Sequence, residues 1–460
     1  MVVAINWTEP SQIDQMWIQT PDKWAESDRD RGIDLRQGLI GFNYYESLFS
    51  PNVTATLSFL DSGNIADLGA GGDIQQRPGT VFDNLPLRGN EVLRPKITSY
   101  SGVLDFDTYP LIVDHITRTP STNLKQIVTL NLVSKFAHID KNKKVQKKYY
   151  GNIGNSVSQI LRDELDIPSD RIRVEQTSNA LSFPGNSLKP FDVIRSLGPK
   201  STPIDGASGF FFYENYDGFN FRAVDSLITI GSPYVYTADL DAVVPDEPDP
   251  NWESDPNYRV LAYRVVKHES VTSKLESGTF GSELTQFNFA SSDHVVTNYN
   301  TSDGGLSNTL GSELYTDELF KNNYWNLEEN QSNSVGSIAL EQPGSQEPNS
   351  GFSGNSTFNL NNDSRNHVAN SRMRYNTIYT TVIDAVVPCN VNLRAGATVN
   401  MKFIKLSAGN LNEGNHDEAL SGRYLILHLA HKFTREANNS STTHMTIIRD
   451  TLGLYTPEVG

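Results

Sequence analysis

Alternating apolar and polar residues mark two separated parts of this sequence as β structure. Within 52–59 every second residue is apolar: Val53, Ala55, Leu57 and Phe59. The residues between them are Thr or Ser, so a strand here buries one face and exposes the other. Further strands are predicted at 109–118 and 126–136. Segment 39–140 is therefore predicted to form a first β-barrel or sandwich domain.

The next segment changes to a helical period. Apolar side chains recur at i, i+3, i+4 and i+8: Val157, Ile160, Leu161 and Leu165. Pro168 ends this helix, and a second short helix is predicted over 190–197 with Gly198 at its C-terminus. Aromatic stretches on both sides of a turn at 214–218 predict a β-hairpin. We predict a small α/β module over 141–235.

The densest basic cluster of the chain lies where the period changes. It consists of five lysines: Lys141, Lys143, Lys144, Lys147 and Lys148. A solvated linker at a domain boundary is favoured over a nucleic-acid site, because only Tyr149 and Tyr150 accompany these lysines.

Strand patterning stops after the module and returns near the C-terminus. The acidic, proline-rich segment 236–257 is predicted to be an extended linker. Segments 258–300 and 372–460 are predicted to form a second β domain, whose clearest strands lie at 397–403, 422–431 and 443–449. Between them, 301–371 is rich in Asn, Ser and Gly and is predicted to be an irregular insertion.

The first 38 residues are predicted to form an N-terminal extension, since the charge-dense segment 26–36 sustains no strand or helix period. This segment holds three of the five tryptophans: Trp7, Trp17 and Trp24. They either pack on the chain's own core or anchor the extension on a neighbour.

The charge balance argues against a protein that grips nucleic-acid phosphates. The chain has 54 acidic and 38 basic residues and a net charge of −16. Its single cysteine, Cys389, cannot form an internal disulfide and indicates a reducing compartment. The sequence shows no export signal and no run of about eighteen apolar residues. We expect a soluble, cytoplasmic protein without a membrane span.

No catalytic, cofactor-binding or metal-ligating residue is assigned, and no cofactor is expected. The carboxylate pairs at 163–164 and 239–241 offer spacing alone, and such pairs are ordinarily solvated. His428 and His431 lie in a strand-like run, where a spacing of three sends two side chains to opposite faces. His431 is therefore interpreted as a structural histidine. We expect no enzymatic activity.

Three sets of residues, in this order along the chain, resemble the central baseplate hub proteins of contractile-tailed phages, including those that infect cyanobacteria. The matching residues are 44–51 with 85–91, then 189–194 with 209–214 and 217–221, and finally 422–426 with His431 and 449–450. The resemblance covers roughly 40–230 and 375–450.

The resemblance implies an α+β, mainly β protein with two β-barrel tube domains that flank the α/β module. It implies a homotrimer whose six tube domains form a ring, which matches a hexameric tail tube above and a trimeric spike below. The implied partners are tail tube or tube-initiator proteins, the central spike and baseplate wedge proteins. DNA would pass an acidic lumen after contraction without specific binding. The chain would be assembled in the host cytoplasm into the virion tail.

Three other functions remain open from the sequence. A VgrG-like tip protein of another contractile injection system shares the hub architecture, although no glycine-rich β-helix repeat follows residue 450. A tail-associated cell-wall hydrolase is the enzymatic alternative. A sugar-binding receptor module is the third, with Tyr324 and Trp325 as candidate contacts.

Overall fold

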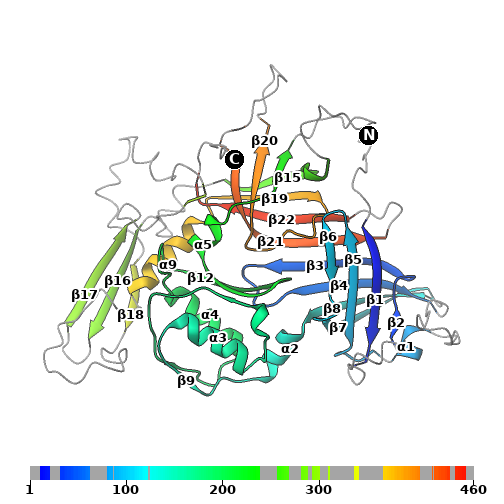
Figure 1. Cartoon of the computed structure of the whole chain (residues 1–460), viewed down its shortest axis with the longest axis horizontal. Coiled ribbons are helices and arrows are strands. Elements are labelled where there is room, and N and C mark those ends of the chain that lie inside the picture. The colour runs from blue at the N-terminus through cyan, green and yellow to red at the C-terminus, as the bar shows by residue number, and fades with distance from the viewer. Residues whose placement is uncertain are drawn as a thin grey trace.

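The structure is a computed structural model of the chain. It describes residues 11–20, 32–62, 80–85, 87–122, 125–238, 256–268, 281–288, 293–300, 309–310, 336–340, 366–404, 417, 419–435 and 441–451. The protein is mainly β with a few short helices, as the alternating segments predict (Figure 1).

One large sheet joins two halves of the protein. The strands of the first half are β1 (Gln12–Gln19), β2 (Ile33–Asp34), β3 (Leu39–Ser47), β4 (Thr54–Asp61), β5 (Val92–Ser99), β6 (Gly102–Asp105), β7 (Leu111–Thr122) and β8 (Lys125–Ser134). The strands of the second half are β14 (Val235–Ala238), β15 (Ala262–His268), β19 (Thr381–Pro388), β20 (Thr398–Phe403), β21 (Gly422–Thr434) and β22 (Ser441–Arg449). Their order is β15-β19-β22-β21-β3-β4-β8-β7-β5-β1-β2, and β6, β20 and β14 branch from this path.

The two halves meet where β3 pairs with β21. This antiparallel ladder runs from Ser47 opposite His428 to Gly41 opposite Thr434. Because the hydrogen bonds continue from one half into the other, the halves share one sheet. No linker lies between them at this join, and Figure 1 shows the sheet running across the molecule.

Each half buries its own core with the inward residues of the alternating strands. The core of the first half includes Phe42, Tyr44, Leu57 and Phe59 on β3 and β4, together with residues of β1, β5, β7 and β8. The core of the second half is built from β14, β15, β19, β20, β21 and β22. The predicted strands of both halves are confirmed, with ends shifted by a few residues.

Part of the segment predicted as an N-terminal extension, residues 12–19, forms a strand that the sequence pattern did not predict. Strand β1 pairs antiparallel with β5, and Met16 and Ile18 are fully buried in the first core. The register shifts between Ile13 and Gln15, so a bulge interrupts the alternation that a sequence pattern needs. Trp17 lies on β1, and the other two tryptophans of this segment lie outside the described residues.

The α/β module lies beneath the sheet in Figure 1. Its elements are α2 (Lys135–Asn142), β9 (Lys148–Tyr149), α3 (Ile153–Asp163), β10 (Ile172–Val174), β11 (Phe183–Pro184), α4 (Pro190–Leu197), β12 (Phe210–Asn215), β13 (Gly218–Ala223) and α5 (Val224–Thr229). The predicted hairpin is confirmed as β12–β13, and β10 pairs parallel with β13. Both predicted helices are present as α3 and α4. Helix α1 (Val81–Asn84) belongs to the first half.

Gly198 follows α4 as predicted, for a reason that the sequence does not reveal. Its φ is −52°, which any residue can adopt, so no left-handed cap is formed. A Cβ at this position would lie 2.7 Å from the carbonyl oxygen of Phe210. Glycine is therefore needed for the close approach of α4 to β12.

Regular structure also occurs where an irregular insertion is predicted. Strand β18 (Gly336–Leu340) and the first half of α9 (Asn366–Thr377) fall within 301–371. Strand β18 joins β16 (Gly281–Asn288) and β17 (Asp293–Asn300) in a separate sheet beside α9. Helix α9 escapes prediction because its buried face is partly polar, as Ser371 and Arg374 are wholly buried. Apart from residues 309–310, the rest of the insertion lies outside the described residues.

The predicted linker 236–257 begins with residues of β14 and ends in a short 3-10 helix, Pro256–Tyr258. Residues 239–255 lie outside the described part. Among the helices that the structure describes, none has the length and apolar character to span a membrane.

Candidate functional site

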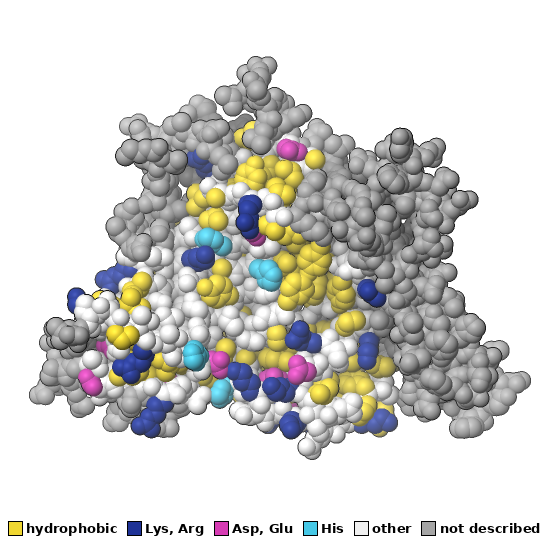
Figure 2. Space-filling view, turned by 180° about the vertical axis from the view of Figure 1, so that it is seen from behind, with side chains coloured by type: hydrophobic (Ala, Val, Ile, Leu, Met, Phe, Trp, Pro, Cys, Tyr) yellow, Lys and Arg dark blue, Asp and Glu magenta, His cyan; other side chains and the backbone are white. Residues whose placement is uncertain are grey.

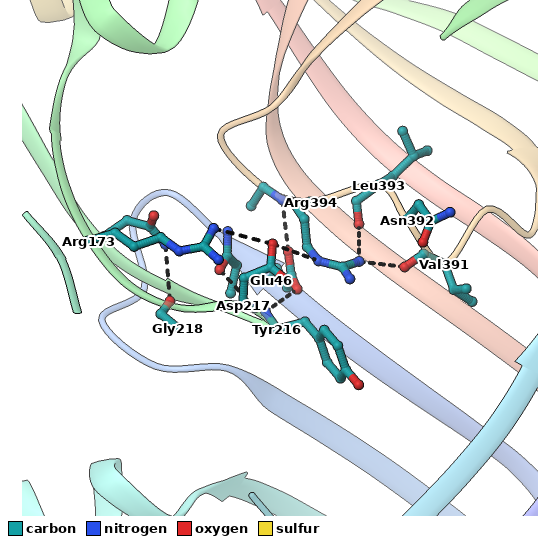
Figure 3. A network of polar contacts seen from close by, with 12 residues as sticks. Glu46, Arg173, Tyr216, Asp217, Gly218, Val391, Asn392, Leu393 and Arg394 are labelled. Atoms are coloured by element: carbon teal, nitrogen blue, oxygen red, sulfur yellow. Dashed lines mark hydrogen bonds and ion pairs between the residues drawn. The ribbon is translucent and has the colours of Figure 1, made fainter. Parts of the chain in front are cut away.

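Glu46 connects both halves and the module at one point (Figure 3). This carboxylate is 2% exposed and lies on β3. It accepts hydrogen bonds from the backbone N–H of Tyr216 at 2.8 Å, from the N–H of Ala395 at 2.8 Å and from the hydroxyl of Tyr44 at 3.0 Å. Burial raises the pKa of Glu46, whereas nearby Arg394 and the two N–H donors lower it. The side chain therefore fixes the β12–β13 turn and the loop before β20 against β3.

Asp217 extends this junction with two ion pairs. Its Oδ2 lies 3.5 Å from Nε of Arg394 and 3.6 Å from Nη1 of Arg173. The guanidinium of Arg394 also lies 4.7 Å from the ring centre of Tyr216 and donates to backbone carbonyl groups of its own loop. The module turn and the second half are thus held together by charge and by a cation–π contact.

Glu214 holds the module to the first half in a second place. It is 1% exposed, and its Oε2 accepts the N–H of Val53 at 3.0 Å. Its other oxygen lies 3.9 Å from Nη2 of Arg171, which stacks on Tyr109 at 4.0 Å from the ring centre. Burial raises the pKa of Glu214 to about 7, against hydrogen bonds from Ser134 and Val53. This carboxyl group is therefore partly protonated near neutral pH.

A cleft of about 570 Å³ opens beside Glu214, between the first half and the module. Its wall includes Tyr109, Lys135, Arg171 and Asp217. Arg171 and Asp217 are already engaged, Arg171 with Glu214 and Asp217 with Arg173 and Arg394. The cleft is therefore a polar boundary that helps to fix the orientation of the module against the first half.

A buried ion-pair triad fixes α9. Arg374 is 0% exposed; its Nε lies 2.6 Å from Asp225 of α5, and its Nη1 lies 3.0 Å from Asp450 after β22. The second oxygen of Asp225 accepts the N–H of Ala207 at 2.7 Å, and that of Asp450 accepts the N–H of Leu310 at 2.9 Å. Every oxygen of the two carboxylates therefore has a donor, as a buried ion pair requires.

On β3, β4, β21 and β22 the outer face of the joined sheet is polar with little charge, and the neighbouring strands β19 and β15 add the ion pair of Asp384 and Arg264. The outward residues of β3 and β4 are Asn43, Tyr45, Ser47, Thr54, Thr56 and Ser58. Those of the paired parts of β21 and β22 are His428, Ala430, Lys432, Thr442, His444 and Thr446. Among these twelve the only permanent charge is Lys432. Figure 2 shows the molecule from behind, where hydrophobic areas, Lys and Arg side chains and a few histidines reach the surface.

Hydroxyl and amide groups of this face bond to one another across the strands. Asn43 Nδ2 donates to Thr56 at 3.3 Å, and the hydroxyls of Ser58 and Thr129 lie 3.1 Å apart. Lys432 Nζ lies 3.5 Å from Nδ1 of His444. Burial and the Lys432 charge lower the pKa of His444, so this imidazole is neutral at pH 7. The face offers polar contact without strong charge.

The two histidines of β21 lie on opposite faces, as their spacing predicts. His428 is on the outer face, whereas His431 is fully buried and stacks parallel to Tyr44. Its Nδ1 lies 2.9 Å from the hydroxyl of Thr443. Burial, with a smaller contribution from Arg394, lowers the pKa of His431 to about 3. Within the described ranges no group of three His, Cys, Asp or Glu side chains is placed to hold a metal ion.

The remaining candidate residues from the sequence are an acidic pair near the surface and one buried cysteine. Asp163 and Glu164, at the end of α3, lie 3.8 and 3.6 Å from Nζ of Lys147. Cys389 is 1% exposed, and burial raises the pKa of its thiol to about 11. The pair at 239–241 and the aromatic residues Tyr324 and Trp325 lie outside the described residues.

The sequence alone did not identify the residues that join the two halves and the module. Glu46 carried a usable signal, because it shares the buried face of β3 with Phe42 and Tyr44, where a carboxylate is out of place without partners. Arg374 and Asp225 gave no such signal, since their segments show no strong apolar period.

No protein-family model and no curated protein sequence matches the chain. In structure it is similar to the tail protein from Neisseria meningitidis MC58, with a TM-score of 0.52 and 7% identity over 97% of this chain and 100% of that chain. It also aligns with the 43 kDa tail protein of prophage MuSo2 from Shewanella oneidensis, with a TM-score of 0.49 and 8% identity over 96% of this chain and 100% of that chain. The first likeness shows that the two proteins share a fold over their whole lengths.

Proposed function

We propose that this chain is a structural baseplate hub subunit of a contractile phage tail. Three copies form a ring that adapts the hexameric tail tube to the trimeric spike and lets DNA pass after contraction. Its partners are the tail tube or tube-initiator proteins, the central spike and the baseplate wedge proteins. The subunit acts mechanically, in the tail of the virion.

The observation that carries this proposal is the continuous sheet through β3 and β21. If each half serves as one tube domain, a trimer presents six of them, which matches the six-fold symmetry of a tube. The shared fold with the tail protein from Neisseria meningitidis supports the same class of function. The junction at Glu46 supports a rigid subunit, because one carboxylate holds both halves and the module.

The outer face of the sheet is the candidate lining of the channel. Its serine, threonine and asparagine side chains are polar but uncharged, so they can contact a DNA backbone without binding it tightly. Low friction would then come from polar side chains with little charge on these strands, and not from the acidic lumen that accompanies the resemblance. Repulsion by acidic residues remains a proposal for other parts of the channel.

The test is the solution mass of the purified chain by light scattering, with averaged negative-stain images. A trimeric ring with a central hole wide enough for a DNA duplex, whose major groove alone spans about 12 Å, is the expected result. A compact monomer that stays monomeric when purified tube and spike proteins are added would overturn the proposal.

A further inference from the structure

A two-stranded ribbon on the module carries most of the basic cluster. Backbone hydrogen bonds join residues 143–148 to residues 184–189, which run antiparallel to them. The N–H of Val145 donates to Leu188 at 2.8 Å, and the N–H of Gly185 donates to Lys147 at 3.0 Å. We call these two segments the basic ribbon. Lys and Arg side chains gather along the lower part of the face in Figure 2, where the module lies.

Like charges face each other across the basic ribbon. Val145 pairs with Leu188, which places Lys144 opposite Lys189. Both lysines are exposed, and so are Lys143 and Lys148. Like charges directly opposite each other destabilise a pair of strands. The ribbon therefore keeps a local repulsion in a protein whose net charge is −16.

The described carboxylates relieve part of this repulsion, since the charge of Lys189 acts on Asp140 and lowers its pKa against the larger effect of burial. Lys147 lies near Asp163 and Glu164, but no described carboxylate forms an ion pair with Lys143, Lys144 or Lys189. The solvated-linker interpretation of this cluster accounts for its exposure. It does not account for two lysines held opposite each other.

Exposed apolar side chains lie among these lysines. Leu188 is 48% exposed and Tyr150 is 59% exposed. Lys148 Nζ lies 5.0 Å from the ring centre of Tyr150. The turn before Leu188 is left-handed at two non-glycine residues, Asn186 with φ 51° and Ser187 with φ 55°. Such a backbone costs free energy and is typical of functional surfaces.

We infer that the basic ribbon docks an acidic segment of a partner protein, in which carboxylates flank an apolar side chain. The carboxylates neutralise Lys143, Lys144 and Lys189, and the apolar side chain covers Leu188. An extended anion such as duplex DNA or a lipid surface also meets the acidic remainder of the chain. A short segment meets only the ribbon, because charges farther than about 8 to 10 Å are screened at physiological salt. The inference does not depend on the proposed function.

The experiment measures fluorescence anisotropy of a labelled peptide of glutamates around a central pair of leucines, with the full chain. The test variant is Lys144→Glu with Lys189→Glu. The control, Lys125→Glu with Lys200→Glu, changes two exposed lysines elsewhere by the same charge. We expect the test variant to bind at least about tenfold more weakly and the control to stay within about twofold, with binding to the wild type weakening as salt rises. Leu188→Ser should weaken binding about threefold to tenfold without changing charge.

Folding of each variant is checked by its thermal melting curve. The single variant Lys144→Glu, which places an acid opposite Lys189, should melt at or above the wild-type temperature while it binds the peptide more weakly. Equal losses of binding in the test and control variants would show that net charge alone explains the weaker binding, and this result would overturn the inference. No binding by the wild type, or tighter binding to duplex DNA or to phosphatidylserine vesicles, would also overturn it.

Discussion

The guanidinium of Arg374 lies 2.6 Å from the carboxylate of Asp225, and both side chains are wholly shielded from solvent. The two residues are 149 positions apart, on α9 and α5. Asp450 completes the triad on the other side of Arg374. Helix α9 is therefore tied to the module and to the end of the second half by one cation.

Removing that cation should destabilise the protein strongly. Arg374→Ala leaves two buried carboxylates without their partner, so we expect a loss of about 3 to 5 kcal/mol in the free energy of unfolding by urea. The matched control is Arg264→Ala, which breaks an ion pair with Asp384 in which the side chains are 76% and 40% exposed. That loss should stay below about 1 kcal/mol. Similar losses in the two variants would contradict a special role for the triad.

Glu214 should make stability fall as pH rises toward neutrality. The folded protein holds its proton up to about pH 7, whereas the unfolded chain releases it near 4.5. Between these values the folded state binds more protons, so stability is lost as pH rises through this window and levels off above it.

Glu214→Gln mimics the protonated form and should remove this dependence. Relative to the wild type, the variant should gain roughly 3 kcal/mol between about pH 4 and about pH 8 in urea unfolding. Its amide oxygen still accepts the N–H of Val53, so the geometry is kept. Parallel stability curves for the two proteins would show that this carboxyl group does not titrate in the window.

Gly396 and Gly89 separate backbone strain from steric overlap. Both have positive φ, of +83° and +96°. A Cβ at Gly396 would overlap the hydroxyl of Tyr213, whereas a Cβ at Gly89 meets nothing within 4 Å. Gly89→Ala should cost about 1 kcal/mol and Gly396→Ala about 2 kcal/mol more, by thermal or urea unfolding. Equal costs would mean that the loop before β20 moves away from the module freely.

Cys389 should resist thiol reagents in the folded protein. With its pKa raised to about 11 by burial, only roughly one thiol in a thousand is ionised at pH 8. Labelling with a chromogenic disulfide should follow global unfolding and become fast in urea. Fast labelling without denaturant would show that the segment between β19 and β20 opens on its own.

The sequence predicted elements that have a clean local period and missed those that do not. Strand β4 and helix α3 follow from spacing alone, and helix α4 follows from Pro190 and Gly198 at its ends. Strand β1 was missed because a bulge breaks its alternation, and α9 because Arg374 makes its buried face polar. The β3–β21 pairing joins residues that are distant in sequence, so no local pattern specifies it. The candidate site could be predicted only at Glu46, whose position on the buried face of β3 is visible in the sequence.

The pairing of β3 with β21 also sets the order in which a subunit can be completed. Ser47 leaves the ribosome long before His428, which lies opposite it in the ladder. At about 5 to 20 residues per second, β3 waits roughly 20 to 80 s with an unpaired edge. A truncated chain would carry that open edge permanently. Until the last strands are translated and β21 pairs with β3, the nascent subunit can therefore aggregate through this open strand edge.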